Sequence, residues 1–219
     1  QSAALLFTTV ADARAAQVPE NQWLYPRATA FCNHAVPVVQ RTDLSRSVVA
    51  RTAGRRAMDL AGITSEGLQH VDLYSCFPAA VQITARELGI PMERQLTVTG
   101  GMTFAGGPLN SYALHATARM AEVLRADPLS IGLVTSVSGF LTKFGAALWS
   151  TEPGVHGWRG EDVTAQAAAE EQPLPEVEDP GDDVTVVAGT VTHDREGART
   201  RIEVVQTPTG ERSLRSTPL

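Results

Sequence analysis

The sequence predicts an α/β fold, in which a mixed sheet packs against helices over residues 27–155 and a small β-rich appendage follows over residues 184–219. Short apolar runs that suit strands alternate with segments of helical periodicity, which implies a layered sheet. A glycine-rich loop at residues 100–108 precedes a long amphipathic pattern. After Thr151 the composition shifts toward acids, prolines and alanines, which marks the end of the main domain.

The elements before the glycine-rich loop follow from the spacing of apolar residues. Gly62 and Gly89 each stand where a helix ends, since glycine adopts the left-handed conformation that such ends require. The expected elements are a buried strand at 3–9, a short helix at 11–16, strands at 28–33 and 71–76, and helices over 48–61 and 78–88.

The elements after the loop are read in the same way. Ser111 is a candidate cap for a long helix that ends at Asp127, because Pro128 cannot continue it. Alternating or continuous apolar runs then predict strands. These strands are expected at 131–137, 146–150, 184–191 and 200–206, with turns at 194–197 and 207–210.

A linker and a tail follow the main domain on these signals. Residues 156–183 are predicted to be a linker, because acids and prolines are frequent and periodicity is weak. Two or three strands are marginally stable alone, so the tail at 184–219 is expected to pack on the main body or to be an incomplete part of a larger β domain. The apolar opening without a starting Met favours a domain whose first part lies upstream of Gln1 or on another chain.

Composition excludes several classes of protein. The 219 residues carry a net charge of -6, which disfavours binding to nucleic acid or to an anionic membrane. No apolar run approaches the roughly 20 residues that a membrane helix needs. Cys32 and Cys76 have neither metal nor disulfide spacing, so no metal site is expected and a reduced cytoplasm is the expected compartment.

Three motifs in order carry a resemblance to a known family. They are Tyr74-Ser75-Cys76-Phe77 after a short apolar run, the loop Gly100–Pro108, and Ser136-Val137-Ser138-Gly139 after the next strand. The chain resembles the thiolase superfamily at these points, especially its sterol-carrier-like and actinobacterial branches. There the loop reads Gly-Gly-x-x-x-x-Gly-His-Pro, and the last turn Cys-x-Gly.

The resemblance covers residues 1–155 and implies a fold of two similar halves that share one active site. Residues 1–26 resemble the end of the N-terminal half, and residues 27–155 resemble the C-terminal half. The nucleophilic cysteine of thiolases belongs to the N-terminal half, upstream of Gln1, and Cys32 does not match it. The missing half or a partner subunit, and hence a homo- or hetero-oligomer, is therefore implied, together with an acyl-CoA ligand and no covalently bound cofactor.

The residues that stand at the family's catalytic positions are altered. Gly107 replaces the histidine that activates the thiolate, and Ser136 replaces the cysteine that moves the α-proton. A glycine cannot ionise and a serine hydroxyl is a poor base, so ordinary thiolysis is not expected. Tyr74 stands where thiolases help to hold the thioester oxygen, and its phenol can donate a hydrogen bond or transfer a proton. The alternative is that Tyr74 only packs at a strand end.

We expect Tyr74 to end a central strand with its hydroxyl facing a pocket, and Gly107 to leave room for a bulky acyl group. The other candidates line that pocket, although the loop could equally be a tight turn that feeds a helix. Cys76 fits a small buried apolar residue better than a reactive thiol. The substrate-binding candidates are Cys76, Phe77, Gly106, Gly107, Pro108 and Asn110.

The resemblance favours a thiolase-like acyl-CoA protein of lipid or sterol metabolism, related to acetyl-CoA acetyltransferases, with altered chemistry. One alternative is a non-catalytic module that binds CoA esters or serves as a scaffold. Another is a retro-aldolase acting on a hydroxyacyl-CoA through Tyr74. Whether the chain is an enzyme stays open, since a reactive cysteine in the upstream half would favour acyl transfer.

Overall fold

The computed structural model describes residues 1–219 as two compact units. The first unit consists of residues 1–34 and 47–167, and the second consists of residues 35–46 and 168–219. The candidate catalytic and binding residues all lie in the first unit.

A mixed five-stranded sheet is the centre of the first unit. Its strands are β1 (Tyr25–Asn33), β2 (His70–Asp72), β3 (Gly132–Ser138), β4 (Lys143–Ser150) and β5 (Arg159–Asp162). They lie in the order β2-β3-β4-β1-β5. The β2–β3 and β1–β5 pairs are parallel, whereas β4 is antiparallel to both of its neighbours. The predicted mixed sheet is therefore confirmed.

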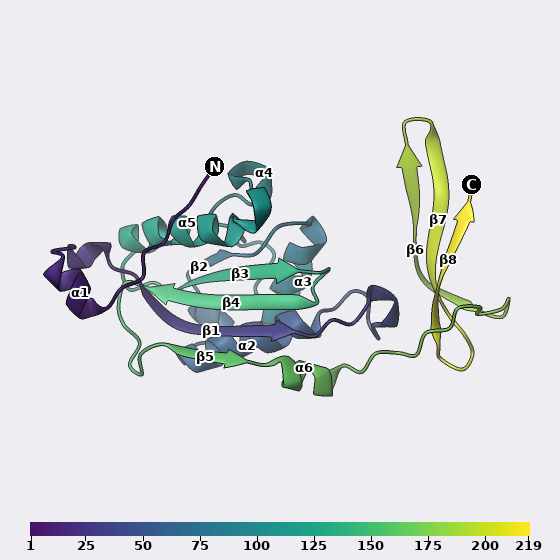
Figure 1. Cartoon of the computed structure of the whole chain (residues 1–219), viewed down its shortest axis with the longest axis horizontal. Coiled ribbons are helices and arrows are strands. Elements are labelled where there is room, and N and C mark those ends of the chain that lie inside the picture. The colour runs from purple at the N-terminus through teal and green to yellow at the C-terminus, as the bar shows by residue number, and fades with distance from the viewer. The chain divides into compact units, whose positions relative to one another are not determined.

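Helices cover both faces of this sheet (Figure 1). The helices of the chain are α1 (Val10–Ala15), α2 (Val48–Ala61), α3 (Pro78–Leu88), α4 (Met102–Ala105), α5 (Tyr112–Ala126) and α6 (Thr164–Glu170). Short 3-10 turns occupy Glu20–Gln22, Val38–Gln40, Ser65–Gly67 and Pro108–Asn110. One face packs an aliphatic core against α2 and α3, and the opposite face packs a smaller, aromatic-rich core against α5. No helix is both long enough and apolar enough to cross a bilayer.

The ends of α2 and α3 follow the sequence signals. The Ser47 hydroxyl accepts the Ala50 N–H at 3.2 Å, and Gly62 ends α2 in the left-handed conformation with φ 71°. Pro78 occupies the first turn of α3, where its missing N–H costs nothing, and Gly89 ends this helix with φ 68°. Both predicted helices are confirmed with these ends.

The N-terminal segment differs from the prediction. Residues 3–9 form no strand, and the Leu6 side chain is 92% exposed. Phe7 contacts Trp149 with ring centroids 6.3 Å apart, yet it stays 68% exposed. An apolar run forms a strand only where a neighbouring backbone accepts its hydrogen bonds, and none pairs with this segment.

Three further elements depart from the sequence reading. β2 ends at Asp72 and is an edge strand, so Tyr74 follows an edge strand and not a central one. The segment predicted as an irregular linker contains β5 and α6, because main-chain pairing with β1 stabilises β5 although its residues are polar and exposed. Ser111 precedes α5 but makes no capping bond; its hydroxyl lies 3.1 Å from His115 Nε2.

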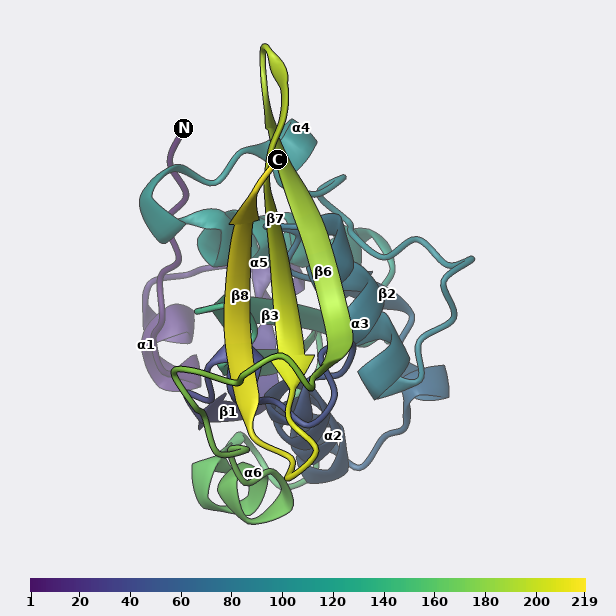
Figure 2. The same cartoon turned by 90° about the vertical axis from the view of Figure 1, so that its right-hand side faces the viewer.

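The second unit contains the β-rich tail. Its antiparallel sheet consists of β6 (Thr185–Asp194), β7 (Gly197–Gln206) and β8 (Arg212–Pro218), which lie side by side in that order (Figure 2). A groove in this unit is lined by residues 178–182 and 214–216, across which an Arg215 N–H donates to the Gly181 carbonyl at 3.0 Å. The predicted turn at 194–197 joins β6 and β7.

The close approach of α2 to α3 at Gly54 generates a stability prediction. A Cβ at residue 54 would lie 2.2 Å from Leu88 Cδ2 and 3.2 Å from Leu88 Cγ. Gly54→Ala gains about 1 kcal/mol of helix propensity but incurs an overpacking cost of about 1–3 kcal/mol. We expect a net loss of about 1 kcal/mol in the free energy of unfolding, measured by urea denaturation.

The matched control removes the clash. In a Leu88→Ala background the facing side chain is gone, so Gly54→Ala should raise the free energy of unfolding by up to about 1 kcal/mol. If Gly54→Ala changed the free energy of unfolding in the same direction in both backgrounds, close packing against Leu88 would not explain the glycine at residue 54.

Candidate functional site

Contacts bring three sequence-distant segments together at one edge of the sheet. Because β2 and β3 are parallel, their carboxyl ends meet at that edge. The Tyr74 N–H donates to Thr135 Oγ1 on β3 at 2.9 Å. The Met102 N–H, in the glycine-rich loop, donates to Ser75 Oγ at 2.8 Å. The segment after β2, the end of β3 and the loop therefore form one candidate site.

Tyr74 lies in the aromatic-rich core under α5. Its ring meets the Tyr112 ring edge to face, with centroids 5.3 Å apart and an interplanar angle of 85°. The side chain is only 8% exposed. Burial, and secondarily the nearby Cys76 thiol, raises the pKa of the Tyr74 phenol. The phenol is therefore protonated at neutral pH and can donate a hydrogen bond.

The glycine-rich loop has a backbone that only glycine adopts easily. Gly100 and Gly101 have φ 82° and 83°, and a Cβ at residue 101 would lie 3.0 Å from Ser75 Oγ. After α4, Leu109 and Asn110 also have positive φ, at 49° and 68°. Strained non-glycine backbone of this kind clusters at functional sites in proteins.

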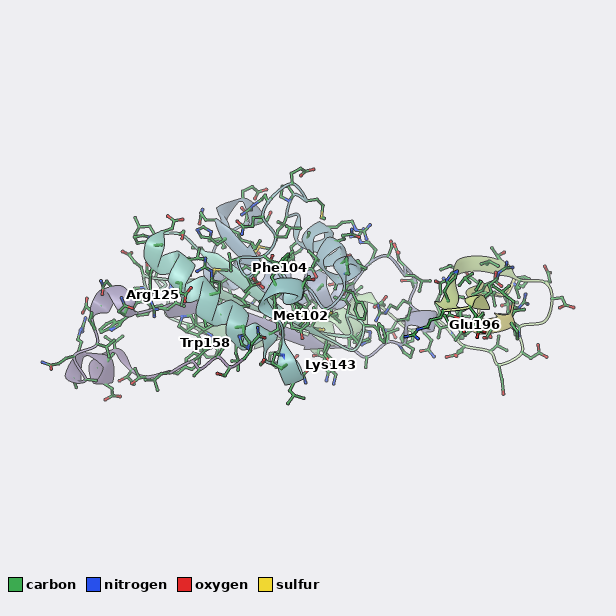
Figure 3. All side chains as sticks on the ribbon, turned by 90° about the horizontal axis from the view of Figure 1, so that it is seen from above. Met102, Phe104, Arg125, Lys143, Trp158 and Glu196 are labelled. Atoms are coloured by element: carbon green, nitrogen blue, oxygen red, sulfur yellow. The ribbon has the colours of Figure 1, made fainter.

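Gly107 is held against the start of α5. A Cβ at this residue would lie 3.1 Å from Tyr112 Cβ and 3.2 Å from Met102 Cε. Met102 and Phe104 are carried by α4, next to the beginning of α5 (Figure 3). The room that glycine was expected to leave is thus partly filled by the Met102 side chain, which is flexible enough to move.

Ser136 faces the same side of the sheet as α5. It pairs with Gly145 across β3 and β4, and its Oγ would lie 2.7 Å from a Cβ at residue 145. Ala147 and Trp149 alternate with Gly145 along β4 and contribute to the core under α5. Ser136 and Tyr74 therefore project from the same face of the sheet.

The remaining candidates are mostly exposed. Phe77 stacks on Phe140 with centroids 6.4 Å apart, although both rings are largely exposed. Pro108 and Asn110 lie on the surface, and Gly106 is partly buried beside the Gln1 side chain. Cys76 is exposed, so the expectation of a small buried residue is wrong; the chain has left the sheet after β2 and turns outward before α3.

The sequence reading missed the polar residues that fix this site. Asp72 is fully buried, and its Oδ1 lies 2.7 Å from Tyr112 Oη. Asp72 Oδ2 accepts the Thr99 N–H at 3.0 Å and lies 2.8 Å from Thr99 Oγ1. The one available signal was an acid inside the apolar run from Val71 to Leu73, which is unusual because buried carboxyl groups need compensating partners.

Burial is the largest influence on the pKa values of Asp72 and Tyr112. It raises the pKa of Asp72, against the lowering effect of hydrogen bonds from Tyr112, Thr99 and the Val98 main chain. It also raises the pKa of Tyr112 to about 12. The structure contains no cluster of three or more His, Cys, Asp or Glu side chains placed to hold a metal ion.

Comparison with solved structures identifies a similar protein. The chain superposes on a monomeric SCP2-thiolase-like protein type 1 from Mycobacterium smegmatis with a TM-score of 0.81 and 32% sequence identity. The match covers 94% of this chain and 46% of that protein, so the chain spans about half the length of its relative.

A more distant similarity is to the peroxisomal 3-ketoacyl-CoA thiolase of Saccharomyces cerevisiae, a five-layered structure built from two core domains of identical topology. It has a TM-score of 0.41 and 20% identity, over 56% of this chain and 33% of that one. No protein-family model and no curated protein matches the chain.

The two cysteines should differ in reactivity. Burial raises the pKa of the Cys32 thiol to about 11, whereas Cys76 is exposed. The thiolate is the reactive form, so at pH 8 iodoacetamide should modify Cys76 in the folded chain and leave Cys32 intact. Mass spectrometry of tryptic peptides measures this, and in urea both should react. Equal labelling of the two in the folded chain would contradict the described burial.

Proposed function

Because the chain belongs to the thiolase superfamily, we propose that it supplies one half of an acyl-CoA site in a protein of lipid or sterol metabolism. The chemistry of this site differs from thiolysis. The other half comes from a further part of the protein or from a partner subunit.

The observation that supports this proposal best is the convergence of three segments on one edge of the sheet. The glycine-rich loop, the Tyr74–Phe77 segment and the end of β3 are joined there by hydrogen bonds. Fixed segments of this kind can hold a thioester in one orientation, which is the first requirement for chemistry at its carbonyl or α-carbon. Met102 forms an adaptable wall that admits a bulky acyl group by moving aside.

Tyr74 is the group that acts on the thioester oxygen. Its phenol is protonated, so it donates a hydrogen bond where negative charge develops on that oxygen. Gly107 has no ionisable group and cannot activate a thiolate. Ser136 is available on the same face of the sheet as a second hydrogen-bond donor rather than as a base.

Two other functions use the same residues. A retro-aldolase acting on a hydroxyacyl-CoA would use the Tyr74 phenol as its proton donor or acceptor, and burial keeps that phenol in the protonated form. A non-catalytic CoA-ester-binding or scaffold module would need the loop and no proton transfer, which the glycine at residue 107 favours. Turnover by the complete protein distinguishes the two enzymes from the module.

Thiolysis provides the first test. We expect no thiolysis of acetoacetyl-CoA above background, because the loss of one general acid–base group alone lowers a rate by about 100- to 10,000-fold. Absorbance of the acetoacetyl-CoA enolate measures the reaction, with the chain alone and combined with its N-terminal half. Robust thiolysis that Ser136→Ala abolishes would overturn the proposed change of chemistry.

Tyr74→Phe is the second test, since it removes only the hydroxyl. In the complete protein turnover of a CoA thioester should fall at least about tenfold, the effect of a lost hydrogen bond of about 1.4 kcal/mol. The midpoint of thermal unfolding should change little. Tyr25→Phe, on β1, is the matched control and should leave turnover unchanged. Unchanged turnover in Tyr74→Phe would show that the Tyr74 hydroxyl takes no part in catalysis.

A further inference from the structure

The buried carboxyl of Asp72 belongs to a closed ring of oxygen atoms that the proposed chemistry does not use. Three oxygen–oxygen contacts make up this ring. Tyr112 Oη lies 2.7 Å from Asp72 Oδ1, Thr99 Oγ1 lies 2.8 Å from Asp72 Oδ2, and Thr99 Oγ1 lies 2.7 Å from Tyr112 Oη. Each distance is that of an O–H···O hydrogen bond, and each such bond needs one proton.

An ionised Asp72 leaves this ring one proton short. The phenol and the hydroxyl of Thr99 supply one proton each, so only two of the three contacts can be hydrogen bonds. The third would then hold two oxygen lone pairs face to face at about 2.7 Å. Ser75 Oγ lies 3.5 Å from Tyr112 Oη, outside the ring, and its proton cannot fill that contact.

A protonated Asp72 supplies the missing proton. Asp72 Oδ1 then donates to Tyr112 Oη, Tyr112 donates to Thr99 Oγ1, and Thr99 donates back to Asp72 Oδ2. The remaining acceptor sites are also used, because the Gly101 N–H donates to Thr99 Oγ1 at 3.1 Å and the Thr99 N–H donates to Asp72 Oδ2. Every polar group of the ring is satisfied in this state.

The surroundings of Asp72 offer hydrogen-bond donors but no positive charge. The groups that act on the carboxyl are the Tyr112 phenol, the Thr99 hydroxyl and main-chain N–H groups, and no charged side chain is among them. The loop residues 97–101 and β3 carry no charged side chain, and Tyr112 is the titratable group that α5 presents. An unpaired buried carboxylate is costly, so the neutral acid is favoured.

We infer that Asp72 is a neutral carboxylic acid in the folded protein at neutral pH, and that its proton closes the ring that fixes the glycine-rich loop. Burial raises the pKa of Asp72, which is the direction that this assignment requires. Asp72 is a positioning residue, since it acts on the loop through Thr99 and on Tyr74 through Tyr112. Its protonation does not depend on the proposed function; only the use of the loop as an acyl site rests on that proposal.

Infrared spectroscopy tests the protonation state directly. The spectrum at pH 7 should contain the C=O band of a protonated carboxyl group, and Asp72→Asn should remove that band. Asp127→Asn is the control, because Asp127 is exposed and pairs with His70 at 2.7 Å, so the band should persist. If no such band exists, or if Asp72→Asn leaves it in place, Asp72 is ionised and the inference is wrong.

The pH dependence of unfolding is an independent measurement. Asparagine reproduces the neutral ring, with its NH2 group donating to Tyr112 and its oxygen accepting from Thr99, so Asp72→Asn should fold. An unfolded Asp ionises at about pH 4. Between that pH and pH 7 the unfolded wild type therefore releases the Asp72 proton, whereas the folded wild type keeps it. The Asp72→Asn variant has no such proton. The unfolding equilibrium constant of the wild type should therefore rise relative to that of Asp72→Asn by about tenfold per pH unit.

The opposite trend would contradict the inference. An ionised Asp72 held by donors would make the wild type gain stability over Asp72→Asn as the pH rises. Failure of Asp72→Asn to fold while Asp127→Asn folds would contradict it equally. Neither result would bear on acyl-CoA binding, which calorimetry with CoA on the wild type measures separately.

Discussion

The hydrogen-bonded ring around Asp72 is the interaction on which the geometry of the candidate site depends. It joins the end of β2, the start of the glycine-rich loop and the first residue of α5, which are separated by 27 and 13 positions in the sequence. A loop with glycines at φ 82° and 83° has many conformations available, and only outside contacts select one. The ring, together with the Ser75–Met102 bond, provides those contacts.

The consequence for function is that a rigid polar framework supports a site with few ionisable groups. The Asp72 and Tyr112 side chains are fully buried, so they shape the loop and do not touch a ligand. The groups nearer the proposed ligand are a phenol, a serine hydroxyl and a glycine backbone. Such a set can orient and polarise a thioester, but it cannot generate a thiolate.

Most of the fold could be predicted from local signals. Glycine and proline at the ends of α2 and α3, and apolar runs at β1, β3 and β4, are short-range features that the structure confirms. The strand predicted from the apolar run at residues 3–9 is wrong, because strand formation depends on a pairing partner that a sequence pattern does not specify. β5 was missed for the converse reason, since pairing with β1 orders residues that are polar and exposed.

The candidate site was predicted only in part. Tyr74, Gly107 and Ser136 were found through motif positions, and the structure brings Tyr74 and Gly107 into contact with the same residue, Tyr112. The ring itself could not be predicted, because Asp72, Thr99 and Tyr112 meet only in three dimensions. Cys76 was expected to be buried at the end of a strand over residues 71–76, but β2 ends at Asp72 and Cys76 is exposed.

The central claim is that this edge of the sheet holds a CoA thioester, and a structure of the complete protein with a bound, non-hydrolysable acyl-CoA analogue tests it most directly. The account predicts that the carbonyl oxygen of the analogue accepts a hydrogen bond from Tyr74 Oη, with the acyl chain against Met102 and the Gly106–Pro108 backbone. An analogue bound elsewhere, or a Tyr74 hydroxyl turned away from its carbonyl, would contradict the account.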